Sequence, residues 1–305
     1  MSFESDLRDL GDPSKRLSAT QLVNFSELDA IEAARFAEVW PSLPDARRLR
    51  AIEAFMELAE DNVDLNFDAV FKLALRDDSS AVRAAAVRGL EEYEARDLIA
   101  VLIDILRNDP DASVRRESAV ALGRYALAAE LDQLAAEDGA QVREALMEAA
   151  ENVEEDERVR ARAIEALGAM SGEDTDNLIE SVYQEESLWL KVGAVDAIGR
   201  SCNTAWLPTV LHELENRAPE MRHAAAYAAG EIGEEEAVAP LKRLAVEDPD
   251  REVQLAAVRA LGVIGGRRAK VALKSILYEG DDDLRDAVQD AMSEIEFGED
   301  PLRQP

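Results

Sequence analysis

Apolar residues recur three and four positions apart along most of the chain, in segments separated by short acidic turns that contain proline or glycine. Asp109 to Gly123, DPDASVRRESAVALG, carries the pattern in full, because an acidic turn with a proline runs directly into an amphipathic segment. This spacing places the apolar residues on one face of an α-helix. No sustained run of β-branched residues alternates with polar ones between hairpin turns, so the sequence predicts helices and no strands.

The same segment returns along the chain with a nearly constant period. An apolar residue, usually followed by arginine, marks each copy: Val82, Val114, Val159, Leu190, Met221, Val253 and Leu284. These markers are 32, 45, 31, 31, 32 and 31 residues apart. A second apolar helix is expected between successive markers. A period of this length indicates an array of stacked helical repeats, each built from two antiparallel helices.

Four further columns keep register with the markers, and each suggests a structural role. An acidic or amide residue lies five positions earlier, where it can cap the helix. The arginine after the marker is expected to bond carboxylates or carbonyls between repeats. Four positions after the marker a small residue permits close helix packing: Ala86, Ser118, Ala163, Ala194, Ala225 and Ala257. A glycine nine positions after it allows close approach or a helix end: Gly123, Gly168, Gly199 and Gly262.

The register divides the chain into three parts of one continuous solenoid. Residues 1–76 do not match the repeat and are expected to form a divergent helical N-terminal cap, since the first repeat has no predecessor to cover it. Residues 77–297 form the array. The long step between markers adds a segment at about 127–140, expected to be a half-helix and turn that bends the array. Residues 298–305 are expected to be a flexible tail.

The column D-P-x-x-x-V-R-x-x-A-x-x-A-L-G, carried by Asp109 to Gly123 and Asp248 to Gly262, resembles a HEAT repeat. More narrowly, the column resembles the short bacterial form of this repeat, which is called the phycobilisome-lyase HEAT-like repeat. The resemblance covers residues 77 to 296 and implies an all-α fold, a right-handed superhelical solenoid of antiparallel helix pairs. It also implies that the second helix of each pair lines a concave face.

The charge of the chain narrows the classes of partner. With 65 acidic and 34 basic residues, the formal net charge is −31. Such a surface opposes approach to nucleic acid and anionic membranes and favours a partner with a basic surface, although a saline or hot habitat would also account for it. One cysteine, no leader-like start and no long apolar run together predict a soluble, cytoplasmic protein without disulfides.

No arrangement of residues in the sequence resembles a catalytic triad, a phosphate loop or a calcium loop. Deoxyhypusine hydroxylase, a relative in the same repeat superfamily, resembles the chain in its repeats and holds two iron ions through several His-Glu pairs. This chain has two histidines and one such pair, His212-Glu213. We therefore predict no catalytic residues, no metal and no cofactor.

Positions that point away from the structural columns are the candidates for binding. Six positions after the markers lie Arg88, Val120, Glu165, Asp196, Tyr227, Arg259 and Asp290. Tyrosine and arginine contribute most to interface energetics. The predicted partner-binding face therefore comprises three residues from these positions and three from neighbouring outward positions. They are Arg88, Arg116, Arg124, His223, Tyr227 and Arg259. The alternative is that these are ordinary exposed helix positions.

The sequence thus predicts a non-catalytic scaffold or adaptor that binds another protein along the concave face of the solenoid. A bilin-lyase-like or chromophore-handling enzyme is the alternative, because the resemblance includes lyases. A long open groove would favour the scaffold and a deep polar pocket the enzyme. The sequence does not predict the oligomeric state.

Overall fold

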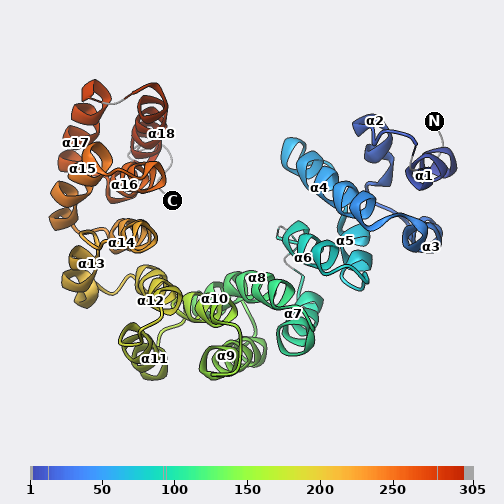
Figure 1. Cartoon of the computed structure of the whole chain (residues 1–305), viewed down its shortest axis with the longest axis horizontal. Helices are drawn as coiled ribbons and strands as arrows, with labels where there is room; N and C mark the ends of the chain where they lie inside the picture. The colour runs from blue at the N-terminus through green and yellow to red at the C-terminus, as the bar shows by residue number, and fades with distance from the viewer. Residues whose placement is uncertain (1–2, 13, 92, 94, 280, 299–305) are drawn as a thin grey trace. The chain divides into compact units, whose positions relative to one another are not determined.

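The computed structural model describes residues 3–12, 14–91, 93, 95–279 and 281–298 (Figure 1). Throughout these residues the chain forms helices and turns and no strand. It divides into two compact units, residues 1–122 and residues 123–305. The predicted all-α class is therefore confirmed. Residues 299–305, most of the segment expected to be a tail, lie outside the described residues.

The α-helices of the first unit are α1 (Phe3–Gly11), α2 (Ala19–Leu22), α3 (Ala30–Val39), α4 (Asp45–Asp61), α5 (Asp68–Ala74), α6 (Ser80–Gly89) and α7 (Asp97–Asn108). Helix α8 (Ala112–Glu130) begins in this unit and ends in the second. The second unit continues with α9 (Ala136–Glu151), α10 (Glu157–Leu167), α11 (Glu173–Tyr183), α12 (Leu188–Ser201), α13 (Leu207–Glu213), α14 (Pro219–Ile232), α15 (Val238–Glu247), α16 (Arg251–Ile264), α17 (Gly266–Glu279) and α18 (Asp282–Gly298). Short 3-10 turns are η1 (Val23–Phe25), η2 (Trp40–Ser42), η3 (Thr204–Trp206) and η4 (Glu235–Ala237).

In the second unit, helices pair and stack as the repeat predicts. Each marker helix packs against the helix before it, as in α11 with α12 and α15 with α16. Successive marker helices α10, α12, α14, α16 and α18 also contact one another, and they form one layer in Figure 1. The small residues that lie four positions after the markers, from Ala86 to Ala257, are fully buried. These residues let helix backbones approach, and the large apolar markers fill the remaining core.

The arginine column performs the structural role expected of it. Arg222 binds Asp248 of the next repeat through Nε and Nη2, at 2.6 and 2.7 Å, and donates from Nη1 to the carbonyl of Asn216 at 2.9 Å. Arg83 binds Asp109 in the same bidentate way, at 2.8 Å from each nitrogen. Arg160 reaches Glu185 at 3.3 Å. Each guanidinium thus joins one repeat to the acidic turn of the next.

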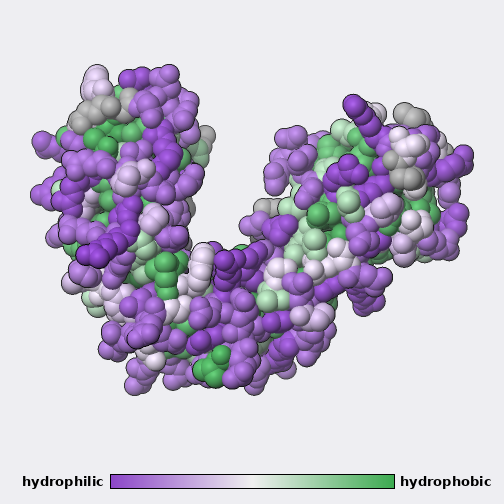
Figure 2. Space-filling model, in the orientation of Figure 1, coloured by the Kyte–Doolittle hydropathy of each residue, from purple (hydrophilic) through white to green (hydrophobic). Residues whose placement is uncertain are grey.

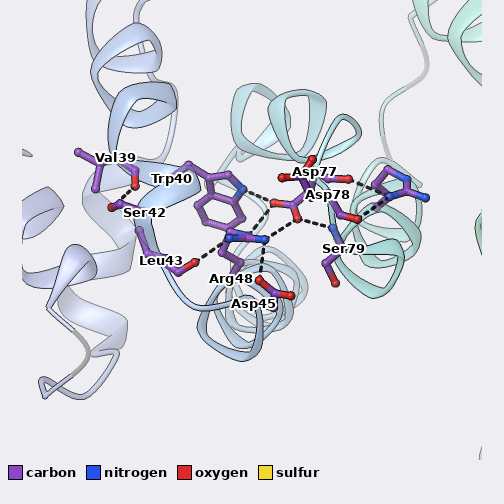
Figure 3. Close-up of polar contacts among 10 residues, drawn as sticks. Val39, Trp40, Ser42, Leu43, Asp45, Arg48, Asp77, Asp78 and Ser79 are labelled. Atoms are coloured by element: carbon purple, nitrogen blue, oxygen red, sulfur yellow. Dashed lines mark hydrogen bonds and ion pairs between the residues drawn. The ribbon is translucent and has the colours of Figure 1, made fainter.

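The arginine column extends into the first 76 residues, ahead of the first copy visible in the sequence. Arg48 on α4 donates a hydrogen bond from Nη2 to the buried carboxylate of Asp77 at 3.0 Å, and its Nε makes an ion-pair contact with the same carboxylate at 2.8 Å (Figure 3). The indole of Trp40 donates to the same carboxylate at 2.7 Å. Trp40 also stacks on Phe36, within an aromatic cluster that includes Phe25 and Phe55. This cluster gives the N-terminal region a core unlike the aliphatic core of the repeats.

The segment at 127–140 contains the last residues of α8, a turn and the start of α9. Gly139 faces Ala129 so closely that a Cβ atom added to the glycine would lie 2.9 Å from the methyl group of Ala129. The longer step between markers is therefore taken up by a longer α8, which packs on the first residues of α9.

Hydrophilic residues cover most of the molecular face in view (Figure 2), as expected from the charge composition. Among the helices that the structure describes, none combines the length and the apolar character that a membrane span requires.

Candidate functional site

The marker helices of the second unit form a pocket of about 620 Å³. Its walls come from α10, α12, α14 and the first residues of α16. The lining residues are Arg162, Glu165, Trp189, Val192, Asp196, Arg200, Pro219, Glu220, His223, Ala224, Tyr227, Asp250, Glu252 and Val253. Concave surfaces with convergent polar groups are the usual setting of small-molecule binding sites.

One sequence column supplies the middle of the pocket. Glu165, Asp196 and Tyr227 each lie six positions after a marker, so the stacking of α10, α12 and α14 brings them onto the same face. Arg200 holds the Glu165 carboxylate through Nη2 at 2.9 Å and Nε at 3.3 Å. Arg162 pairs with the other oxygen of Glu165. Glu165 is therefore fixed in position and its charge is largely balanced.

Asp196 lies in a different electrostatic environment from Glu165. Its nearest cationic contact is Arg162 Nη1, 3.9 Å from Oδ2. Burial, and after it the nearby Glu165 carboxylate, raise the pKa of Asp196 to about 7, although Arg162 and Arg200 act in the opposite direction. A carboxyl group with this pKa can exchange a proton near neutral pH. The pocket thus contains a charged carboxylate and, beside it, one poised to change charge.

Aromatic side chains complete the walls of the pocket. Burial, followed by the Glu231 carboxylate, raises the pKa of Tyr227 to about 12, so its hydroxyl stays protonated and can donate a hydrogen bond at neutral pH. Trp189 is 41% exposed, and the Arg158 guanidinium lies 4.6 Å from the centre of its indole ring. Trp189 therefore lines the pocket instead of filling the core between repeats.

The lining has an excess of negative charge. Two arginines face five acidic residues: Glu165, Asp196, Glu220, Asp250 and Glu252. The formal charge of the lining is therefore negative, and a concave site that carries mainly one sign of charge favours a ligand of the opposite sign. The arrangement suits an ammonium or guanidinium group, with carboxylates as acceptors and an aromatic ring alongside.

The six predicted binding residues do not form a single cluster. His223 and Tyr227 line the pocket, while Arg259 is exposed on α16 outside it. The Arg124 guanidinium lies over the ring of its neighbour Tyr125, 4.8 Å from the centroid. In the first unit, Arg88 and Arg116 both pair with Glu117, at 3.4 and 2.8 Å. Their role in binding a partner stays a prediction.

Sequence reasoning placed Glu165 and Asp196 in the outward column but left them out of the binding residues, and it missed Arg200. The available signal was two acids in one column of adjacent repeats, followed one turn later by a base. The prediction chose arginines as binding residues instead of these two acids, because arginine is the commoner residue at protein interfaces.

A model of HEAT repeats matches residues 67–145, 175–250 and 207–293, which together exceed half of the chain. The chain therefore belongs to the HEAT-repeat family, as the columns predicted. The narrower resemblance to phycobilisome-lyase repeats stays a prediction.

Two curated relatives are named deoxyhypusine hydroxylase. The chain is 33% identical over 109 residues to that of Cryptococcus neoformans var. neoformans serotype D (strain B-3501A), which is 34% of this chain and 30% of the relative. It is 32% identical over 111 residues to that of Saccharomyces cerevisiae (strain ATCC 204508 / S288c), 34% of each protein. The chain thus spans about a third of the length of these relatives.

Two solved structures are also similar to the chain. Human deoxyhypusine hydroxylase in complex with glycerol is 18% identical, with 97% of each chain covered and a TM-score of 0.39. Kap95p bound to RanGDP is 16% identical, with 99% of this chain and 42% of that chain covered and a TM-score of 0.43.

The prediction of a non-catalytic scaffold or adaptor is wrong, because the curated relatives are enzymes by name. The bilin-lyase alternative is wrong for the same reason, since those relatives are hydroxylases. Both errors have one physical cause. The repeat columns encode helix packing, which is common to scaffolds and enzymes, whereas chemistry resides in outward positions that have no fixed pattern.

The residues present do not fit the iron centre that the resemblance to deoxyhypusine hydroxylase implies. The whole chain has two histidines, His212 and His223. His212 is exposed on α13, while His223 faces the pocket from α14. Across the part of the chain that the structure describes, no three side chains of His, Cys, Asp or Glu are grouped to hold a metal ion. Imidazole and carboxylate sets of the kind that bind iron are thus not formed here, and no step through a metal is assigned.

Proposed function

We propose that the chain is an enzyme whose acidic pocket on α10, α12 and α14 binds an amine-bearing side chain of a protein substrate. The observation that carries the proposal is the pair Glu165 and Asp196, set among three further acids in one concave site. The name of the curated relatives supports the same class of substrate, because deoxyhypusine is an amine-bearing residue. The net charge of −31 would favour encounter with a basic protein.

The two carboxylates would have different tasks in this site. Glu165, fixed by Arg162 and Arg200, would define the shape and polarity of the pocket. Asp196, whose pKa is raised to about 7, would accept the ammonium group as a charged hydrogen-bond partner and could take up or release a proton during turnover. The aromatic rings of Tyr227 and Trp189 would lie beside the alkyl part of the substrate.

Binding of a lysine analogue tests this proposal. We expect Nα-acetyl-lysine amide to bind the full chain, as measured by calorimetry, and to bind more tightly than its neutral analogue Nα-acetyl-norleucine amide. Asp196→Asn should weaken binding by about tenfold, the size of one charge-assisted hydrogen bond. Glu215→Gln, an exposed acid outside the pocket, is the matched control and should leave the affinity unchanged.

The same experiment has a defined pH dependence. Asp196 is mostly neutral below its pKa of about 7 and charged above it, and a bound ammonium favours the charged form. The affinity should therefore increase by about tenfold from pH 6 to pH 8. Asp196→Asn should remove this dependence. His223 also faces the pocket, and the dependence should survive in His223→Gln.

Equal binding of the two analogues would contradict the proposed substrate class. A pH dependence that persists in Asp196→Asn but disappears in His223→Gln would assign the titration to the histidine and contradict the role of Asp196.

A basic protein partner and membership of the phycobilisome-lyase branch are finer predictions, which rest on charge and on repeat length respectively.

A further inference from the structure

Residues 253–278 contain no aspartate or glutamate, although the chain has 65 acidic residues. The same stretch carries five bases, Arg259, Arg267, Arg268, Lys270 and Lys274. Four of them lie on α17, together with two exposed apolar residues. Helix α17 therefore combines positive charge and apolar surface in a protein whose net charge is −31.

One face of α17 is fixed in the core and the other is open. Ala269, Leu273 and Ile276 are fully buried against the neighbouring helices. On the opposite face, Arg267, Val271, Lys274 and Tyr278 follow at steps of four, three and four residues, which align on one side of a helix. These four residues are the α17 stripe. Val271 and Tyr278 are 63% and 86% exposed, so neither of them is packed into the core.

The charges of the stripe are not consumed by ion pairs within the described part of the chain. Arg267 and Lys274 have no ion-pair partner there, whereas the adjacent Arg268 pairs with Glu235 at 3.1 Å. On the neighbouring helix α15, Lys242 donates to Ser275 of α17 at 2.8 Å, which adds a further positive charge beside the stripe. The stripe therefore offers cations to a ligand together with two apolar contacts.

We propose that the α17 stripe is a docking site for a short acidic peptide segment with an apolar residue among its carboxylates. Arg267 and Lys274 would bind the carboxylates, and Val271 and Tyr278 would contact the apolar residue. Helix α17 has 14 residues and is about 21 Å long, a length that about six residues of extended peptide would span. The site is separate from the acidic pocket, whose walls come from the marker helices.

Charge decides between a peptide and the other anionic ligands. A nucleic acid or an anionic membrane extends far beyond α17 and would meet the acidic surface of the rest of the chain, with its net charge of −31. A short peptide covers only the stripe, and charges farther away than the screening length of about 8 Å at physiological salt add little repulsion. The stripe thus suits a compact anion and disfavours an extended one.

The test uses the full chain and a fluorescein-labelled peptide of about six residues in which leucine lies among Asp and Glu, a length set by that of helix α17. We expect saturable binding by fluorescence anisotropy that weakens as salt is raised. The double variant Arg267→Glu, Lys274→Glu should lose at least about tenfold in affinity. The matched control Arg76→Glu, Arg217→Glu changes the net charge equally at exposed positions elsewhere and should retain the affinity. Circular dichroism establishes that each variant is folded.

The apolar part of the site has its own readout. Tyr278→Ser should lower the affinity for the peptide without changing the salt dependence of binding, because it removes an apolar contact and no charge. Equal losses in the stripe variant and the control variant would overturn the proposal. So would stripe-dependent binding of an oligonucleotide, anionic vesicles or a second copy of the chain with higher affinity than the peptide. Because no substitution in this experiment lies in the pocket, its failure leaves the lysine-analogue result intact.

Discussion

Replacing Asp77 with alanine is expected to lower the free energy of unfolding of the first unit by about 3–5 kcal/mol. The Asp77 side chain is 2% exposed and that of Arg48 is 7% exposed, so both charges of this pair are removed from water. Trp40 and the backbone amide of Ser79 donate to the same carboxylate (Figure 3). Alanine would leave the buried guanidinium with the exposed Asp45 carboxylate and the Leu43 carbonyl as acceptors, and it would remove the acceptor of the Trp40 indole. Removing the buried partner of a buried charge is among the most destabilising changes a single substitution can make.

The chain contains a matched control for this substitution. Asp45 binds the same arginine, at 2.9 Å from Nη2, but its side chain is 75% exposed. Asp45→Ala should therefore cost less than about 1 kcal/mol. Asp77→Asn, which keeps an acceptor and the side-chain volume, should fall between the two.

Trp40 reports on this unit directly. In a Trp189→Phe, Trp206→Phe background it is the remaining tryptophan of the chain, so urea unfolding followed by its fluorescence measures the region around Asp77. Equal losses for Asp77→Ala and Asp45→Ala would contradict the argument, because the two carboxylates differ mainly in burial.

Gly168→Ala is expected to destabilise the second unit by about 2–3 kcal/mol. A Cβ atom on Gly168 would lie 2.4 Å from the carbonyl oxygen of Ala197 and 2.6 Å from its Cα atom. Both atoms belong to the backbone of α12 and cannot rotate away. Gly168 has a φ of −55°, an ordinary helical value, so the expected loss comes from steric overlap with α12 and not from backbone conformation.

Gly123 occupies the same sequence column and should respond in the opposite direction. A Cβ atom there would lie 3.4 Å from the methyl group of Ala166, an ordinary contact. Since Gly123 lies inside α8, alanine should gain about 0.5–1 kcal/mol from helix propensity. Urea unfolding followed by circular dichroism compares the two variants. An equal loss of stability in both variants would contradict this prediction. It would show that the cost of alanine does not depend on the distance between neighbouring helices.

The fold was largely predictable because its information is local and repeated. The markers, the small column and the arginine column each recur with the same chemistry, so one copy helps to interpret the next. Arg222 and Arg83 bind the acidic turns that their spacing suggested. Arg48 was harder to recognise, since its acidic partner Asp77 belongs to the first recognisable repeat while the surrounding residues 1–76 do not match the columns.

The candidate site was predictable only in part. The outward column contains both Asp196 and Asp290, and nothing in their spacing separates them. In the structure, Asp290 is exposed on α18, whereas Asp196 lies in a pocket beside Glu165 and has a pKa raised to about 7. Burial and the approach of a like charge from the next repeat make the difference, and both depend on how the helices stack.

The sequence by itself determined the helical class, the repeat register, the family and the acidity, because helix periodicity and packing columns are written in neighbouring residues. Tertiary structure alone decided which outward residues share a pocket, which glycines touch a neighbouring backbone and which bases of α17 lie on one open face. These properties depend on distances between helices that are far apart in the chain. A carboxylate acquires an unusual pKa, and a helix face becomes a surface, only after the repeats have stacked.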